Sequence, residues 1–443
     1  MTDTARPPGL PDPPGLTAPP GPPGPPGLTA PAATAAEVPR WYARPAARAW
    51  NPPAAADGEA SSAAGVQAFH ASIPGYAPTP LTEFPALAAQ LNVGRVFVKD
   101  ESWRLGLPAF KVLGASWAVA RLVAAQAGLT GQLTFAAVAA AARGAPGGSQ
   151  LILVTATDGN HGRAVARMAA LLGLRAQVFV PRVISPQSAA AIAAEGAAVT
   201  AVDGTYDEAV ARAAGFAAEH PADRALVQDT GWPGYEEVPG WVVAGYATLS
   251  REIDAQLGEA GASGPALVAV PVGVGSLAQA IVGHYRCGGS EHRPAVLAVE
   301  PDTAACVLVS LSAGKLSQVS TAETIMAGLN CGTPSSICWP MLRAGLDAAI
   351  AVSDHDTARA VSDLAALGLQ AGPSGAASLA GARSALTGPG CARRRAELAV
   401  GAASVVVLLS TEGRCEEVSP RPAPERLPGS RPADPGNPAQ PAR

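Results

Sequence analysis

The hydrophobic pattern of this chain alternates between two kinds of segment. Short β-branched and apolar runs are separated by longer alanine-rich stretches with helical spacing of their apolar residues. The short runs, bounded by turn residues, are typical of buried strands, whereas the longer stretches are typical of helices. The predicted strands lie at residues 95–100, 151–157, 176–181, 197–203, 224–229, 266–272, 295–301 and 404–411.

The order of these segments indicates the fold class. Residues 189–199 and 206–220 are predicted crossover helices between strands, and such alternation favours an α/β fold with mostly parallel sheets. Because more strands are predicted than one compact sheet would hold, we expect two α/β domains with a cleft between them. In such folds ligands bind beyond the carboxyl ends of the strands, where the chain turns into helices.

The two ends of the chain differ in composition from the rest. Residues 1–37 and 418–443 are rich in proline, glycine and alanine, and such segments bury too little apolar surface to offset the entropy of ordering. We expect disordered tails there. Between them, the larger domain is predicted to comprise residues 38–111 and 216–417, and the smaller domain residues 112–215.

Charge and cysteine content narrow the functional classes. With 31 Lys and Arg against 35 Asp and Glu, the net charge of −4 favours neither nucleic acid nor an anionic membrane as a partner. No apolar run has the roughly 18 residues of a membrane span, and Arg6 is followed by prolines where a secretory signal would be apolar. We expect a cytoplasmic protein without a metal site, because no metal-ligand spacing occurs among the six cysteines: Cys287, Cys306, Cys331, Cys338, Cys391 and Cys415. Cys306 and Cys331 flank one loop and could meet.

Lysine is scarce in this chain, so each of its three lysines is a candidate functional group. Lys111 lies where a predicted strand and a polar loop lead through Phe110 into an apolar helix. A helix N-terminus and apolar neighbours should lower the pKa of an amine, which Schiff-base chemistry requires. The alternative is a surface lysine with a buried stem. Lys99 is the next candidate after Lys111, and Lys315 is the third lysine.

A second motif, TATDGNHG, ends a predicted strand and opens a helix. Its glycines allow a tight turn, and Asn160 offers an amide to a phenolate or carboxylate oxygen. Asp158 could be an acidic group in a site or only the N-cap of the following helix.

Two further strand ends carry candidate binding groups. In PVGVGS, Gly273, Gly275 and Ser276 can present main-chain N–H groups and a hydroxyl at a helix N-terminus, which suits a phosphate. The spacing lacks the third glycine of a dinucleotide site. In SVVVLLST, the hydroxyls of Ser410 and Thr411 suit a pyridine nitrogen that is not held protonated, although a simple strand-end turn would use the same residues.

Together, in this order, these motifs resemble the fold-type II pyridoxal-phosphate enzymes, the family of the tryptophan synthase β-subunit and threonine dehydratase. The resemblance covers roughly residues 80–413. Within that family the chain is most similar to the diaminopropionate ammonia-lyases. The segments that carry this likeness are KDES with AFKVLGAS, ATDGNHGRAVA, VQDTGWPGYEEVPGWVVAGYATL and TIMAGLNCGTPSSICWPMLR.

The resemblance implies a cofactor, a reaction and a set of site residues. Pyridoxal phosphate would lie in the interdomain cleft of a homodimeric enzyme that eliminates ammonia from 2,3-diaminopropionate to give pyruvate. Two carboxylates would select a substrate with an extra cation and move its protons. The implied roles are a Schiff base for Lys111, a ring-oxygen contact for Asn160, phosphate binding for Gly273, Val274, Gly275 and Ser276, a pyridine-nitrogen contact for Thr411 or Ser410, and acidic groups facing the substrate for Asp158 and Asp229.

Other functions remain open at this point. A serine or threonine dehydratase, or a β-replacement enzyme, would use the same lysine and phosphate loop, but such relatives usually carry serine where this chain has Asp158. Three departures from the family pattern, Ala115, Pro373 and Arg414, bear on substrate preference. A cofactor-binding scaffold without activity is the non-enzyme alternative, and the intact Lys111 and Asn160 argue against it.

Overall fold

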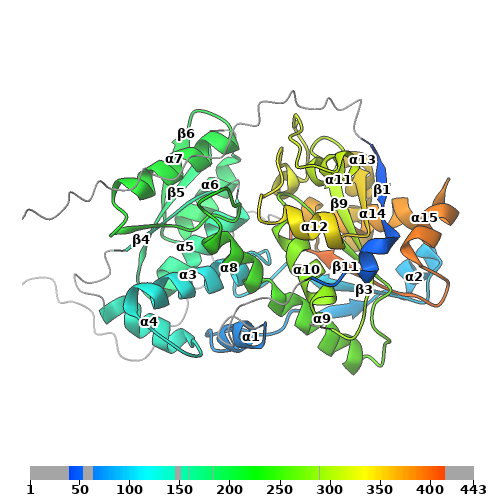
Figure 1. Ribbon diagram of the computed structural model, residues 1–443, viewed down its shortest axis with the longest axis horizontal. Helices are drawn as coiled ribbons and strands as arrows, with labels where there is room; N and C mark the ends of the chain where they lie inside the picture. The colour runs from blue at the N-terminus through cyan, green and yellow to red at the C-terminus, as the bar shows by residue number, and fades with distance from the viewer. Residues whose placement is uncertain are drawn as a thin grey trace, which may run out of the picture.

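The computed structural model describes residues 39–52, 63–144, 151–157, 159–182, 184–288 and 290–414. The predicted tails, 1–37 and 418–443, lie outside these residues. Within them the chain forms two sheets, each covered by helices (Figure 1). The smaller sheet lies on the left of Figure 1 with β4, β5 and β6, and the larger sheet lies on the right with β9, β11 and β3.

Seven strands of the described chain form the larger sheet. Its five central strands are parallel to one another, and an antiparallel strand closes each edge. In spatial order the strands are β1 (Trp41–Ala43), β10 (Ala348–Val352), β9 (Ala295–Pro301), β8 (Leu267–Pro271), β11 (Val405–Ser410), β3 (Arg95–Asp100) and β2 (Leu81–Glu83).

The central strands are buried on both faces, which explains why they read as continuous apolar runs. In β11, Val406 and Leu408 pack in a core cluster with α14 (Pro373–Leu386), whereas Val407 and Leu409 belong to the cluster that contains α10 (Ser276–Arg286). Successive side chains of a strand point to opposite faces. One strand therefore contributes to the cores on both sides of the sheet.

The smaller sheet contains four parallel strands, in the order β6 (Ala198–Val202), β5 (Arg175–Pro181), β4 (Ile152–Ala156) and β7 (Arg224–Leu226). Helix α7 (Tyr206–Glu219) packs against β4 and β5. It begins with a capping box, in which Thr205 and Glu208 each bond the other's main-chain N–H. The domain boundaries stay a prediction, and β7 lies beyond the predicted smaller-domain segment, 112–215.

The remaining helices surround these sheets. On the smaller sheet's side are α3 (Val112–Ala127), α4 (Phe135–Gly144), α5 (Asn160–Leu172), α6 (Pro186–Ala194) and α8 (Glu237–Gly245). Around the larger sheet are α1 (Ala63–Ala71), α2 (Pro85–Leu91), α9 (Ala247–Glu259), α11 (Cys306–Ala313), α12 (Trp339–Gly345), α13 (Asp354–Ala366), α15 (Cys391–Leu398) and the 3-10 helices η2 (Pro45–Ala49) and η4 (Ala327–Leu329).

Helices α3 and α8 cross at very short range. A Cβ on Gly245 would lie 2.5 Å from the carbonyl oxygen of Leu113, and a Cβ on Gly114 would lie 2.6 Å from the Tyr246 ring. Only glycine allows the two backbones to approach so closely. The contact fixes the first turn of α3, directly after Lys111.

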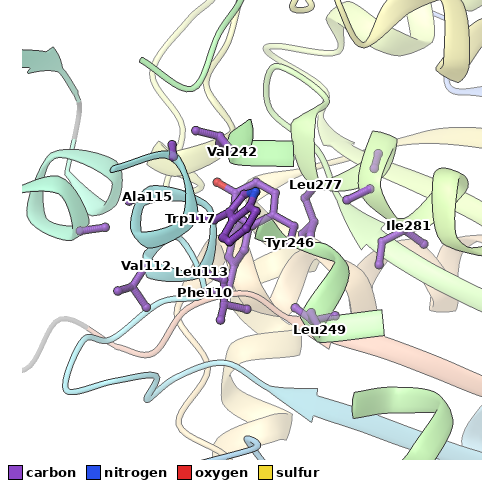
Figure 2. Close-up of a cluster of buried hydrophobic side chains, with 14 of the residues drawn as sticks. Phe110, Val112, Leu113, Ala115, Trp117, Val242, Tyr246, Leu249, Leu277 and Ile281 are labelled. Carbon is purple, nitrogen blue, oxygen red and sulfur yellow. The ribbon is translucent and has the colours of Figure 1, made fainter. Parts of the chain in front are cut away.

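An apolar cluster continues this contact into the larger sheet's helices (Figure 2). Phe110 packs against Tyr246 with 4.8 Å between ring centroids, and Trp117 of α3 is 1% exposed. Leu277 and Ile281 of α10 belong to the same cluster. One continuous core therefore connects the helices of both sheets.

Each predicted strand overlaps a strand of the structure, but the pattern missed three others. Strands β1 and β2 have three residues each, and β10 (Ala348–Val352) is mostly alanine, which reads as helix. No helix in the described part of the chain is long and apolar enough to cross a membrane.

Candidate active site

A pocket lies at the carboxyl ends of strands from both sheets. It is lined by residues that follow β3, β4, β6, β7, β8 and β11. The structure therefore brings together residues that the sequence analysis selected from separate motifs: Lys111, Asn160, Asp229, Gly273, Val274, Gly275, Ser276 and Thr411. Ser410 is not among the lining residues, and Asp158 lies outside the residues that the structure describes.

Lys111 occupies the N-cap position of α3, and its side chain is 21% exposed. Its Nζ donates a hydrogen bond to Oδ2 of Asp229 over 2.6 Å. The short polar loop before it and the apolar helix after it place the amine at the pocket wall. An amine and a carboxylate that face one cavity at this distance can exchange protons with a bound molecule.

The two other lysines lie elsewhere. Lys99 is completely buried in β3 and donates hydrogen bonds to a main-chain carbonyl, to Oε2 of Glu252 over 2.7 Å and to Oε1 of Gln256 over 2.8 Å. Burial lowers the pKa of Lys99. Lys315 is exposed on the surface. Lys111 is therefore the one lysine of the three that lines the pocket.

Asp229 is a buried carboxylate between two basic side chains. Its Oδ2 lies 2.6 Å from Lys111 Nζ and 3.8 Å from Nδ1 of His161. Burial opposes ionisation of Asp229, but these neighbours hold its pKa at about 2. Burial also lowers the pKa of His161, so its ring is uncharged at neutral pH. At neutral pH Lys111 is then the charged neighbour of Asp229, and its Nζ also donates the hydrogen bond that favours the ionised carboxylate.

The sequence analysis assigned no role to His161, which also lines the pocket. Its Nε2 donates a hydrogen bond to the carbonyl oxygen of Val227 over 2.8 Å, because a carbonyl can only accept. The other ring nitrogen, Nδ1, has no hydrogen-bond partner among the described residues and faces Asp229. In the sequence, the feature that could have identified His161 is its position next to Asn160 in the DGNHG motif.

The glycine loop after β8 forms a cradle. Gly275 has a φ of +102° and caps α10, where the first main-chain N–H groups have no partner within the helix. A Cβ on Gly273 would lie 3.1 Å from both the Cys331 thiol sulfur and the Gly328 carbonyl oxygen. Ser276 donates its hydroxyl to the main-chain oxygen of Asp229 over 2.9 Å.

The end of β11 adds a carboxylate that the sequence analysis did not select. Thr411 lines the pocket, whereas Ser410 is fully buried behind it and its hydroxyl has no partner among the described residues. Glu412 follows, and its Oε2 accepts a hydrogen bond from Nδ2 of Asn160 over 2.7 Å. Ser374, whose buried hydroxyl likewise has no partner in the described chain, lines the pocket beside it. In the sequence, the feature that could have identified Glu412 is its position just after the carboxyl end of a predicted strand.

Comparison with known proteins assigns the family. Residues 73–411 match the family model described as pyridoxal-phosphate dependent enzyme. The chain belongs to this family. The family match covers the pocket segments from the loop before Lys111 to Thr411, which follows β11, and ends one residue before Glu412.

Curated relatives of this PLP-dependent enzyme include diaminopropionate ammonia-lyases. The chain is 37% identical over 296 residues to the one from Salmonella typhimurium, covering 65% of this chain and 72% of that protein. It is 34% identical over 360 residues to the one from Escherichia coli K12, covering 78% of this chain and 86% of that protein.

Solved structures agree with these sequence matches. The Escherichia coli diaminopropionate ammonia-lyase in complex with an aminoacrylate–PLP azomethine reaction intermediate superposes with a TM-score of 0.72 at 32% identity, covering 82% of this chain and 91% of that chain. Its complex with D-serine gives a TM-score of 0.74 at 33% identity, covering 82% and 92%. The maize serine racemase, at 21% identity and a TM-score of 0.63, shares the fold.

These matches confirm the predicted resemblance, the fold-type II α/β fold with mostly parallel sheets, and pyridoxal phosphate as the cofactor. The pocket fits that cofactor, because it combines a lysine, a glycine cradle that a Cβ at Gly273 would fill, and the unpaired hydroxyl of Ser374. The roles of individual residues stay predictions. Four cysteines in the described part of the chain, Cys287, Cys306, Cys338 and Cys391, are free thiols, so Cys306 does not pair with Cys331.

Proposed function

We propose that this chain catalyses the α,β-elimination of 2,3-diaminopropionate, which with one water gives pyruvate and two molecules of ammonia. The observation that carries the proposal is the 2.6 Å contact between Lys111 Nζ and Asp229 Oδ2 in the pocket. Similarity to the Escherichia coli diaminopropionate ammonia-lyase over 86% of that enzyme supports the same substrate class.

Most of the residues predicted to bind the cofactor have a part in holding it. Pyridoxal phosphate, when bound, supplies an electron sink that stabilises negative charge on the substrate's Cα. Lys111 would bind it covalently, and Asn160 would donate to its ring oxygen. Thr411, which lines the pocket, is the better candidate than Ser410 for the pyridine nitrogen. Main-chain N–H groups would hold the phosphate along Gly273, Val274, Gly275 and Ser276.

Lys111 and Asp229 would share the proton chemistry. Once the substrate's amino group has displaced it from the cofactor, the neutral Lys111 amine would take the proton from Cα on the face of the substrate that it reaches. Asp229 orients this amine, and because its pKa is held at about 2 it stays negative at neutral pH. A fixed negative charge favours a substrate with a second ammonium group over serine, which has a neutral hydroxyl.

Asp158 is the proposed second base. A substrate of the opposite configuration presents its Cα proton to the other face, out of reach of Lys111, and the carboxylate of the DGNHG motif would take it. We expect Asp158→Asn to slow one enantiomer of diaminopropionate, the D form, by about 10²- to 10⁴-fold and the other much less. Asp229→Asn should slow both. Equal losses on both enantiomers for Asp158→Asn would leave that residue a binding or capping role.

The decisive experiment supplies each enantiomer of 2,3-diaminopropionate, and separately serine, to the purified protein with pyridoxal phosphate. Pyruvate release is followed with a coupled lactate dehydrogenase reaction. We expect pyruvate from diaminopropionate at a higher kcat/KM than from serine. Faster turnover of serine would assign the chain to the dehydratases instead, and absence of pyruvate from all substrates would favour the scaffold alternative.

A cytoplasmic location and a homodimeric assembly complete the proposal. Free thiols at Cys287, Cys306, Cys338 and Cys391 suit a reducing compartment. The dimer follows from the resemblance of the sequence motifs to fold-type II enzymes. Light scattering of the purified protein measures the mass in solution, and a mass of one chain would contradict the dimer.

A further inference from the structure

Glu412 occupies a junction of three segments at the pocket. Its main chain bridges Ala109, two residues before Lys111, and accepts a hydrogen bond from the Gly372 N–H over 2.9 Å. Its half-buried side chain uses both carboxylate oxygens. Oε2 accepts from Nδ2 of Asn160 over 2.7 Å, and Oε1 accepts from the main-chain N–H of Ser374 over 3.1 Å.

This carboxylate joins the two sheets across the pocket. Asn160 begins α5, which follows β4 of the smaller sheet, whereas Glu412 follows β11 of the larger sheet. Ser374 lies in the first turn of α14, which has Pro373 at its start and no side-chain cap on Gly372. A single residue therefore links the Asn160 helix, through its side chain, to the segment that carries Lys111, through its main chain.

The contact fixes the orientation of the Asn160 amide. A carboxylate can only accept hydrogen bonds, so Nδ2 of Asn160 must face it. Rotating the amide by half a turn would place Oδ1 against Oε2 of Glu412, where two acceptors repel. Since Nδ2 carries two hydrogens and Glu412 takes one, the second N–H stays available to another acceptor in the pocket.

The surroundings hold the Glu412 carboxylate in place. A Cβ on Gly372 would lie 3.1 Å from both Cγ and Oε1 of Glu412, so this wall is in close contact with the side chain. The Ser374 N–H, at the positive end of α14, adds a fixed donor. Glu412 is therefore restrained from both sides and can restrain Asn160 in turn.

We propose that Glu412 is a positioning residue that sets the Asn160 amide so that an N–H of Nδ2 points to the ring oxygen of the cofactor. The proposal rests on the proposed function, because it requires that the pocket binds pyridoxal phosphate. Removing the carboxylate releases the amide, and the ring oxygen loses a donor that favours its negative form. Its proton affinity then rises.

The test uses the full chain reconstituted with pyridoxal phosphate and four variants: Glu412→Gln, Asn160→Ala, the double variant and Glu397→Gln. Glutamine has one acceptor oxygen for the two donors that Glu412 serves. Glu397 is the matched control, since its carboxylate is 23% exposed and accepts from Trp41 and Arg393, away from the pocket. Equilibrium dialysis gives the cofactor dissociation constant, and a pH titration of the near-visible absorption gives the midpoint of the bound chromophore.

We expect Glu412→Gln and Asn160→Ala each to weaken cofactor binding by about tenfold, the size of one lost hydrogen bond, and to move the midpoint about one unit upward. The double variant should match Asn160→Ala, because Glu412 acts through that amide. Glu397→Gln should match the unmodified protein in both measurements.

Additive losses in the double variant, or an absorption that responds to pH as in the unmodified protein, would reduce Glu412 to a cap of α14 and overturn the proposal. A fifth variant, Glu412→Asp, keeps the charge but shortens the side chain: restored affinity supports the proposal only if the midpoint is restored with it. Failure of the unmodified protein to bind pyridoxal phosphate would instead contradict the proposed function, which the same dialysis measures first.

Discussion

Lys111 and Asp229 form an ion pair with 2.6 Å between Nζ and Oδ2, although 118 positions separate them in the chain. The pair spans the pocket from the start of α3 to the segment after β7. The Asp229 carboxylate holds the Lys111 ammonium in one place. The ammonium in turn favours the ionised form of the carboxylate.

The first prediction concerns Lys111→Ala. The unmodified protein with pyridoxal phosphate should be yellow, and borohydride should fix the cofactor to the chain. We expect the variant to lose both properties and to lose turnover by at least about 10²- to 10⁴-fold. Lys315→Ala removes an exposed lysine and serves as the control. A borohydride-fixed adduct that survives in Lys111→Ala would contradict the assignment.

The second prediction concerns the pH dependence of stability through Asp229. Its pKa is about 2 in the folded chain, below the ordinary value of about 3.9. A depressed pKa stabilises the folded state above the ordinary pKa, and this stabilisation is lost as the pH falls toward 2. We expect Asp229→Asn to lower the free energy of unfolding by about 2 kcal/mol at neutral pH, and the difference from the unmodified protein to vanish near pH 2.

Denaturant unfolding at a series of pH values measures this difference. A constant gap between variant and unmodified protein from neutral to acidic pH would mean that the ion pair is not its source.

The third prediction concerns the glycine cradle. Gly275→Asp puts a side chain at a position with a φ of +102° and a negative charge beside the proposed phosphate. A Cβ there would also lie 2.8 Å from Leu342 Cδ1. Cofactor affinity, measured by dialysis, should fall by at least about a hundredfold, because backbone strain and charge repulsion both act. Each factor of ten in affinity corresponds to about 1.4 kcal/mol of binding free energy.

Gly288→Asp is the matched control for the third prediction. Gly288 also has a positive φ, +77°, but a Cβ there meets nothing within 4 Å. Equal losses of cofactor affinity in the two variants would show that backbone strain, and not the phosphate site, causes the effect.

The fourth prediction concerns a buried cluster of charged side chains that includes residues of the loop between β3 and Lys111. Glu252 accepts from Arg104 over 2.7 and 2.8 Å and from Lys99 over 2.7 Å, and Arg104 also pairs with Glu101. All four side chains are at most 2% exposed. Removing one partner leaves buried charges uncompensated, so Glu252→Gln should lower the free energy of unfolding by about 3 to 5 kcal/mol.

Thermal and urea unfolding measure the fourth effect. The control is Glu83→Gln, which breaks a solvent-exposed pair with Arg95 and should change stability little. If both variants unfold alike, the buried cluster contributes no more than a surface pair.

The sequence predicted the sheets because buried parallel strands carry a strong local signal. Residues 405–410 are a nearly continuous β-branched and apolar run, and residues 96–98 are a shorter one between charged residues. Strand β10 (Ala348–Val352) was missed because alanine favours helix, and its place between β1 and β9 comes from tertiary pairing.

For the site, local patterns located the groups that sit on one turn or strand end. Lys111 and Gly275 each lie at a loop-to-helix junction that the sequence displays directly. The hydrogen bond between Asn160 and Glu412 joins positions 252 residues apart, and no local period encodes it. The choice of Thr411 over Ser410 as a lining residue likewise depends on how β11 is rotated in the sheet.

The short strand β1 has a consequence for the handling of this protein. It pairs Trp41, Tyr42 and Ala43 with β10, which would otherwise be the last strand of a long parallel sheet. An unprotected edge of this kind offers unpaired main-chain groups to other chains and promotes aggregation. A truncation that removes residues up to Ala43 would therefore expose the edge of β10 and promote self-association, even though it removes no residue of the pocket.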